Sequence, residues 1–184
     1  MSFVHLRLHT EYSLENGLVR IEKKKSPSPL MEALQAGEMP AVAVTDLGNL
    51  FAVVKFYRAA TGAGIKPIFG TEVRIHPKEE SGLESRLILL AQNDSGFKNI
   101  KTLVSRSFIE GQRRGVPQLD RAWFEGLTEG VICLSGGRSG DVGLALLADE
   151  QEQAKRYLQQ WSALFPGRYY IELQRTERSG DENW

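Results

Sequence analysis

The chain reads FVHLRLHTEYSLENG over residues 3–17, and apolar and polar side chains alternate through the first part of this stretch. In a strand, successive side chains point to opposite faces. One face here is apolar, and the other carries two imidazoles and a guanidinium, from His5, Arg7 and His9. The pattern predicts an opening strand with one apolar and one polar face, as in the first strand of a barrel with a polar inner end.

Two interpretations of this polar face follow from the residues alone. Imidazoles that share a strand face are a common way to hold a metal. Here His5 and His9 stand four residues apart with Arg7 between them, and a guanidinium is always charged and cannot coordinate a cation. A hydrogen-bonded polar strand end is therefore favoured over a working metal site.

Composition describes an ordinary globular protein, with 41% hydrophobic and 25% charged residues among 184. The 23 basic and 23 acidic residues give a formal net charge of zero, which disfavours an autonomous nucleic-acid-binding module. The single cysteine, Cys133, excludes an internal disulfide and indicates a reducing compartment. Because the chain shows neither a signal-peptide pattern nor an apolar run of membrane-spanning length, we expect a cytoplasmic protein with no membrane partner.

Apolar runs and helical patterns alternate along the chain. Strands are predicted at residues 41–46, 66–73, 86–91, 131–135 and 169–173, and helices at residues 29–35, 50–62, 94–110, 119–127 and 154–165. Regular alternation predicts an α/β fold with a mainly parallel sheet, either open or closed into a barrel. About six strands are fewer than the eight of a full (βα)₈ barrel, so we expect a fold that stops short of its last strands.

Two carboxylates stand where such folds place their chemistry. Asp46 ends the apolar run at residues 41–46, and Glu72 lies near the end of the next strand. A glycine-rich turn, GGRSGD at residues 136–141, follows a later strand but lacks the P-loop pattern. A tight turn is therefore favoured there over a phosphate site.

Four stretches together resemble one family: HLRLHTEYSLENG, AVAVTDLGNLFAVVKFYRAATGAGIKPIFGTEV, GVICLSGGRSGDVG and FPGRYYIEL. In this order they are similar to the N-terminal PHP (polymerase and histidinol phosphatase) domain of the alpha subunit of bacterial DNA polymerase III. The resemblance implies a distorted (βα)₇ PHP barrel over residues 1–174, incomplete because the chain stops before the last strands. A polar C-terminal tail is expected at residues 175–184.

The resemblance also implies where a metal pocket would lie. In active members of that family a cluster of divalent metals at the strand ends activates water for phosphoester hydrolysis. Matched residue by residue, the ligands retained here are His9, Asp46 and Glu72, and His5 matches a supporting position. The substituted pocket positions are Arg7, Asn16, Leu47, Arg86 and Gly137.

The substitutions to arginine suggest what replaces the metal charge. Arg7 and Arg86 are expected to pair with Asp46 and Glu72. Three retained ligands beside two arginines cannot hold a metal cluster. The resemblance therefore implies a vestigial pocket with no catalytic residue, no metal and no other cofactor.

This degenerate PHP domain is expected to be a catalytically inactive scaffold in DNA replication. The expected partners are the proofreading exonuclease subunit, which docks on such domains, and the rest of the polymerase alpha chain, with DNA contacted only through the full-length holoenzyme. The alternative is an active metal-dependent phosphoesterase or 3′–5′ exonuclease. The full-length parent resembles a DNA-directed DNA polymerase, a nucleotidyltransferase, whereas we expect the fragment alone to be inactive.

Overall fold

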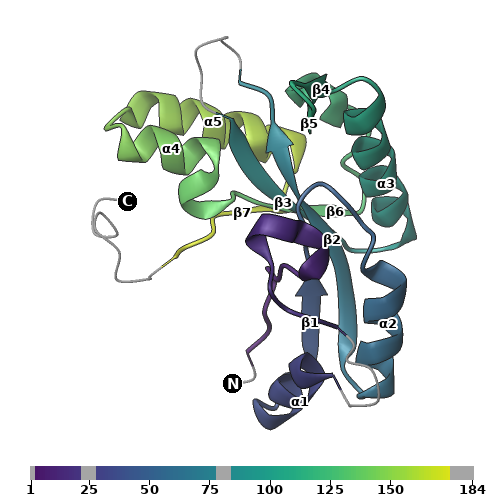
Figure 1. The fold of residues 1–184 in the computed structure, drawn as a ribbon. Coiled ribbons are helices and arrows are strands. Elements are labelled where there is room, and N and C mark those ends of the chain that lie inside the picture. Colours follow the sequence, from purple (N-terminus) through teal and green to yellow (C-terminus); the bar gives the residue numbers. More distant parts are fainter. Residues whose placement is uncertain (1–2, 22–27, 78–83, 175–184) are drawn as a thin grey trace. The chain divides into compact units, whose positions relative to one another are not determined.

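A computed structural model describes residues 3–21, 28–77 and 84–174. The chain forms two units, Met1–Glu72 and Val73–Trp184, and Figure 1 traces their helices and strands. Strands and helices alternate as the sequence predicts, so the α/β class is confirmed. The predicted polar tail at residues 175–184 lies outside the described residues.

The first unit is built around two parallel strands. Strand β1 (Ala41–Val44) pairs with β2 (Lys66–Ile75), whose last residues enter the second unit, and Ala41 lies opposite Lys66. Helix α2 (Val53–Gly62) connects them, so the three elements form a βαβ unit. The 3-10 helix η1 (Glu11–Asn16) and helix α1 (Pro29–Ala36) precede β1, and Gly37 is the C-cap of α1.

The predicted opening strand is present only as an extended segment beside β1. His5 forms an isolated parallel bridge with Val42. The carbonyl oxygens of His5 and Leu8 accept hydrogen bonds from the N–H groups of Ala43 and Thr45. The prediction of a full strand is therefore only partly right. The two donors on β1 are two residues apart but their acceptors, His5 and Leu8, are three apart, so the regular parallel ladder is interrupted.

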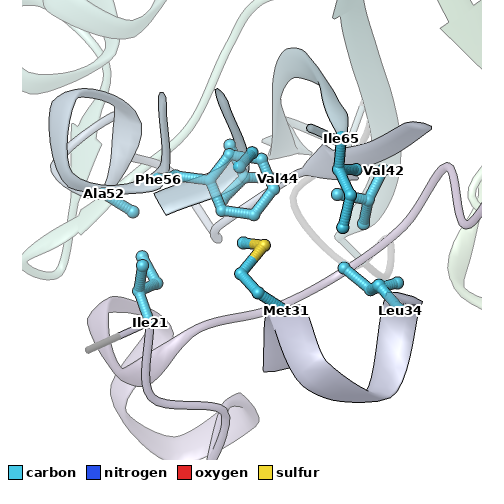
Figure 2. Close-up of a cluster of buried hydrophobic side chains, with 9 residues drawn as sticks. Ile21, Met31, Leu34, Val42, Val44, Ala52, Phe56 and Ile65 are labelled. Carbon is cyan, nitrogen blue, oxygen red and sulfur yellow. The ribbon is translucent and has the colours of Figure 1, made fainter. Parts of the chain in front are cut away.

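Figure 2 shows the core of the first unit, where side chains of α1 and α2 meet those of β1. Met31 and Leu34 of α1 and Phe56 of α2 are almost fully buried in it. The remaining members of this cluster are Ile21, Val42, Val44, Ala52, Ala60 and Ile65. This packing holds the two helices against the parallel strands whose ends carry the predicted site.

The buried face of α2 differs from the predicted stripe. Leu50, Val53, Val54 and Tyr57 repeat at helical spacing and predict the buried stripe. Val54 and Tyr57 are instead 63% and 52% exposed, whereas Phe56 and Ala60 are fully buried. The helix carries apolar residues on both faces. Periodicity alone therefore did not identify the buried one.

The second unit carries strands of both directions. Strand β3 (Ser85–Ala91) pairs antiparallel with β6 (Val131–Leu134), and β6 pairs in parallel with β7 (Tyr169–Tyr170). The expected parallel pairing therefore holds for β1–β2 and β6–β7 but not for β3–β6. A continuous apolar run indicates burial on both faces but does not give the direction of the neighbouring strand.

Helices and a small hairpin complete the second unit. Helix α3 (Asp94–Ile109) is capped by Asn93, whose side chain accepts a hydrogen bond from the Gly96 N–H. Strands β4 (Gln112–Arg113) and β5 (Val116–Pro117) form the hairpin, followed by the 3-10 helix η2 (Arg121–Phe124). The glycine-rich turn is the 3-10 helix η3 (Gly137–Ser139), and α4 (Asp141–Leu147) and α5 (Gln151–Leu164) follow it.

The core of the second unit contains an aromatic cluster. The rings of Phe124, Trp161 and Phe165 are almost fully buried, and Phe124 meets each of the other two edge to face. Across both units, no helix in the described part of the chain is long and apolar enough to cross a membrane.

Candidate functional site

Glu72 is the centre of a charged cluster in the first unit. Its side chain is fully buried, and its Oε2 accepts a hydrogen bond from Nε of Arg7 at 3.0 Å and forms an ion pair with Nη2 of Arg7 at 2.8 Å. His9 Nε2 lies 2.8 Å from the same oxygen. Arg7 and His9 reach one carboxylate because residues two apart on an extended segment point to the same side.

Asp46 is held by a different set of partners. Its carboxylate is 1% exposed and accepts hydrogen bonds from the Thr10 N–H at 2.7 Å, the Thr10 hydroxyl at 2.7 Å and the Ser13 hydroxyl at 2.6 Å. Thr10 is the N-cap of η1, and the Ser13 hydroxyl also accepts from the Leu47 N–H. Asp46 therefore ties the start of η1 to the end of β1.

The backbone brings these two carboxylates next to each other. Leu47 and Glu72 form a parallel bridge, and the Glu72 N–H donates to the Asp46 carbonyl at 3.1 Å. The Thr71 hydroxyl donates to the same carbonyl at 2.7 Å. Asp46, two residues past β1, and Glu72, within β2, therefore lie on hydrogen-bonded neighbouring segments of the chain.

The structure also places the other predicted positions of the first unit. Leu47 is half-buried, and Asn16 is exposed at the last residue of η1. His5 is exposed, and its ring meets Phe3 edge to face at 4.8 Å. The ring of His5 thus contacts Phe3, on the surface, whereas Arg7 and His9 contact Glu72.

Arg86 and Gly137 belong to the second unit. Arg86 is half-buried in β3, and its carbonyl oxygen would lie 2.2 Å from a Cβ added to Gly136. Gly137 has φ +56°, and a Cβ there would lie 2.7 Å from Cδ of Gln174. The Gln174 amide therefore fills the space that a side chain at residue 137 would need.

The donor atoms of the first unit can be compared with what a metal cluster requires. Metal ligands must offer lone pairs that no proton or guanidinium occupies. Oε2 of Glu72 faces Arg7 and His9, and both oxygens of Asp46 accept hydrogen bonds. Within residues 3–21, 28–77 and 84–174, no three His, Cys, Asp or Glu side chains are grouped as metal ligands would be. In this arrangement the residues do not fit a cluster of divalent metals.

Sequence reasoning missed the residues that hold Asp46. Thr10 and Ser13 lie inside the opening stretch, and an N-capping signal at Thr10 was available because threonine commonly begins a helix. Their partner, Asp46, lies 36 residues further along the chain than Thr10. No local sequence pattern indicates that these side chains meet. Gln174, which covers Gly137, was equally beyond the reach of local patterns.

Comparison with known proteins gives a consistent result. A family model described as "PHP domain" matches residues 5–176. The chain is 48% identical over 181 residues to the DNA polymerase III subunit alpha of Pseudomonas fluorescens and 40% identical over 182 residues to that of Escherichia coli K12. These alignments cover 98% and 99% of this chain, which spans 15% of the length of each relative.

Two solved structures are similar over part of the chain. An amidohydrolase from Chromobacterium violaceum has a TM-score of 0.40 and 15% identity, covering 56% of this chain and 32% of its own. A protein of Bifidobacterium adolescentis, provisionally described as a metal-dependent phosphoesterase, has a TM-score of 0.46 and 9% identity, covering 88% of this chain and 82% of its own.

Proposed function

We propose that this chain is a structural part of a replicative polymerase. The chain belongs to the PHP domain family and matches the N-terminal region of DNA polymerase III alpha subunits. In this proposal it holds the proofreading exonuclease subunit and hydrolyses no phosphoester itself. It works in the cytoplasm and meets DNA only through the full-length polymerase. Nucleotide transfer belongs to other parts of the parent chain.

The contact between Arg7 and Glu72 carries this proposal. Hydrolysis by a metal cluster needs carboxylates that face the metals and a water activated between them. Here a guanidinium lies 2.8 Å from the buried Glu72 carboxylate and supplies positive charge to it. Asp46 is likewise committed to Thr10 and Ser13. The cluster is thereby suited to fix strand ends and η1 in place.

One observation favours the competing proposal of an active metal-dependent phosphoesterase or 3′–5′ exonuclease. His9, Asp46 and Glu72, three residue types that bind divalent metals, all lie beside the end of β1. If Arg7 swung out to solvent, its side chain being 25% exposed already, Glu72 would be released for a metal. The two proposals therefore differ in what Arg7 does.

A paired measurement on the full-length alpha chain separates the two proposals. Calorimetric titration with the exonuclease subunit of the same organism is expected to give a one-to-one complex. Incubation with Mn²⁺ or Zn²⁺ and a chromogenic phosphodiester is expected to give no hydrolysis that depends on Glu72. The matched control is Glu72→Gln, which keeps the shape but removes the charge. Metal-dependent hydrolysis in the wild type that this variant lacks would establish the enzyme instead.

A further inference from the structure

Asn16 is the only asparagine of the chain that is followed by a glycine. It lies at the last residue of η1, where its side chain is exposed. Within the part of the chain that the structure describes, its amide forms no hydrogen bond. Asparagine is one of the thermolabile residue types. The exposed amide is therefore open to reaction with the backbone that follows it.

The reaction that this pair of residues permits is loss of the side-chain amide. The deprotonated backbone nitrogen of Gly17 attacks Cγ of Asn16, the new N–Cγ bond replaces the bond from Cγ to Nδ2, and ammonia leaves. Water then opens the cyclic imide at either of its carbonyl groups. One opening gives aspartate, and the other gives isoaspartate, in which the main chain runs through Cβ and Cγ. One water is consumed and one ammonia released, so the reaction needs no oxidant, reductant or cofactor.

The fold itself requires the glycine that makes this reaction easy. Glycine has no Cβ to obstruct the approach of its nitrogen to the preceding side chain. In the structure Gly17 is buried, and a Cβ added to it would lie 1.9 Å from the carbonyl oxygen of Thr10. A larger residue at position 17 would protect Asn16 but would not fit against Thr10. The close approach of the two backbones thus preserves the reactive pair.

The segment that follows Asn16 returns to the start of η1. Thr10 and Val19 form a parallel bridge, and the Glu11 N–H donates to the Val19 carbonyl at 2.9 Å. The loop between these contacts is therefore closed at both ends. Isoaspartate adds one carbon to the main chain inside this loop, directly before the tightly packed Gly17. The added length has to be taken up by movement of the backbone around Thr10.

Thr10 is one of the residues that hold the buried carboxylate of Asp46, through its N–H at 2.7 Å and its hydroxyl at 2.7 Å. We propose that Asn16–Gly17 is a site of spontaneous, age-dependent modification, and that isoaspartate at this site loosens the hold of Thr10 on Asp46. Conversion to ordinary aspartate leaves the main chain at its original length and leaves this contact in place. The modification does not depend on the proposed scaffold function.

Asn93 is the matched comparison within the same chain. It is exposed, as Asn16 is, but its Oδ1 accepts a hydrogen bond from the Gly96 N–H at 2.9 Å, where it caps α3. The residue after it is Asp94, which has a Cβ. Both the held side chain and the bulkier neighbour hinder the attack, so Asn93 should convert more slowly.

The first test ages the full-length alpha chain at mildly alkaline pH, where a backbone nitrogen loses its proton more often. Trypsin releases residues 8–20 with Asn16 and residues 87–98 with Asn93. Mass spectrometry with electron-transfer fragmentation then measures asparagine, aspartate and isoaspartate in each peptide. We expect conversion at Asn16 to be at least roughly tenfold faster, which corresponds to a barrier lower by about 1.4 kcal/mol. Equal rates at the two asparagines would overturn the modification site.

The second test follows hydrogen exchange of the segment that contains Thr10 in the intact chain. In molecules that carry isoaspartate, exchange should be faster than in fresh protein by roughly tenfold or more. Asn16→Gln keeps an amide but forms the cyclic imide poorly, so the aged variant should exchange as fresh wild type does. Fresh Asn16→Asp carries the new charge without the longer main chain and should also be unchanged.

Each result of the second test supports or overturns the loosened contact. Isoaspartate without faster exchange would overturn it and leave the modification site standing. Equally fast exchange in fresh Asn16→Asp would assign the effect to charge instead of main-chain length. Equally fast exchange in aged Asn16→Gln would show that ageing acts elsewhere in the protein, and would overturn the loosened contact as well.

Discussion

Arg7 and Glu72 form an ion pair in which the carboxylate is completely buried and the guanidinium is partly open to solvent. The Arg7 side chain is 25% exposed, the Glu72 side chain is 0% exposed, and Nη2 lies 2.8 Å from Oε2. A buried carboxylate without a positive or hydrogen-bonding partner is costly. The stability of the first unit should therefore depend on Arg7 more than on an ordinary surface arginine.

Replacing Arg7 with alanine should destabilise the protein. Glu72 would keep only His9 among the partners described above, and we expect a loss of about 1–3 kcal/mol in the free energy of unfolding. Urea unfolding followed by circular dichroism measures this loss. Arg58→Ala, at an exposed position of α2, is the control and should change the stability by less than about 0.5 kcal/mol. An unchanged Arg7→Ala protein would show that water replaces the guanidinium without cost.

Two substitutions of Asp46 should differ clearly. Asp46→Ala leaves the Thr10 N–H and two hydroxyls without their acceptor and should cost about 2–4 kcal/mol. Asp46→Asn should cost about 1 kcal/mol or less, because its carbonyl can accept from the Thr10 N–H while the Thr10 hydroxyl rotates to accept from the new amide. Urea unfolding of both variants provides the comparison. Equal losses would mean that the negative charge itself is required.

Protein purified without a chelator should contain no stoichiometric zinc, manganese or iron. The reason is the direction of the donor atoms, since Oε2 of Glu72 faces Arg7 and the oxygens of Asp46 accept hydrogen bonds. Elemental analysis by mass spectrometry measures bound metal per chain. A second sample, loaded with these metals and then desalted, controls for losses during purification. Two or more metals retained per chain would contradict the scaffold proposal.

Stability should fall at alkaline pH because of Cys133. Burial, and to a lesser extent the charge of Asp141, raises the pKa of the Cys133 thiol well above its usual value. The pKa of Tyr169 is also raised, mainly by burial. Above the ordinary thiol pKa the unfolded chain releases a proton that the folded chain keeps. Unfolding then becomes easier by about 1.4 kcal/mol per pH unit for the thiol alone.

The alanine variant of Cys133 isolates this effect from other titrating groups. Unfolding free energies of the wild type and of Cys133→Ala, measured from pH 7 to about pH 10, should run parallel below the thiol's ordinary pKa. Above it the wild type should lose stability faster. Parallel curves over the whole range would show that the thiol titrates in the folded state.

Asp141 should be the most sensitive position of the second unit. Its Oδ2 accepts hydrogen bonds from Nη2 of Arg121 at 2.7 Å and Nε1 of Trp161 at 2.8 Å, and its carboxylate is 4% exposed. Asp141→Ala should cost about 3–5 kcal/mol, because it leaves a mostly buried guanidinium unpaired. Trp161→Phe removes only one of these bonds and part of the ring, and it should cost less. Thermal unfolding of both variants compares the two losses of stability. A larger loss for Trp161→Phe would mean that packing of the indole matters more than the ion pair.

Local sequence was sufficient for much of the fold. A continuous apolar run and a helix ended by glycine are short-range signals, so β1, β2 and α1 were predicted close to their observed bounds. The positions of Asp46 just past β1 and of Glu72 near the end of β2 followed from the same signals. The PHP family resemblance, carried by four long stretches, was also available from sequence and is confirmed by the family match.

Tertiary structure decided what local patterns leave open. The buried face of α2 depended on which side met β1, and the antiparallel direction of β3 against β6 depended on the path of the chain between them. Arg7 was expected to pair with either carboxylate, and the fold places it on Glu72 while Thr10 and Ser13 hold Asp46. Periodicity describes neighbours a few residues apart, whereas these contacts join residues separated by more than 30 positions. Only packing determines which of those distant groups meet.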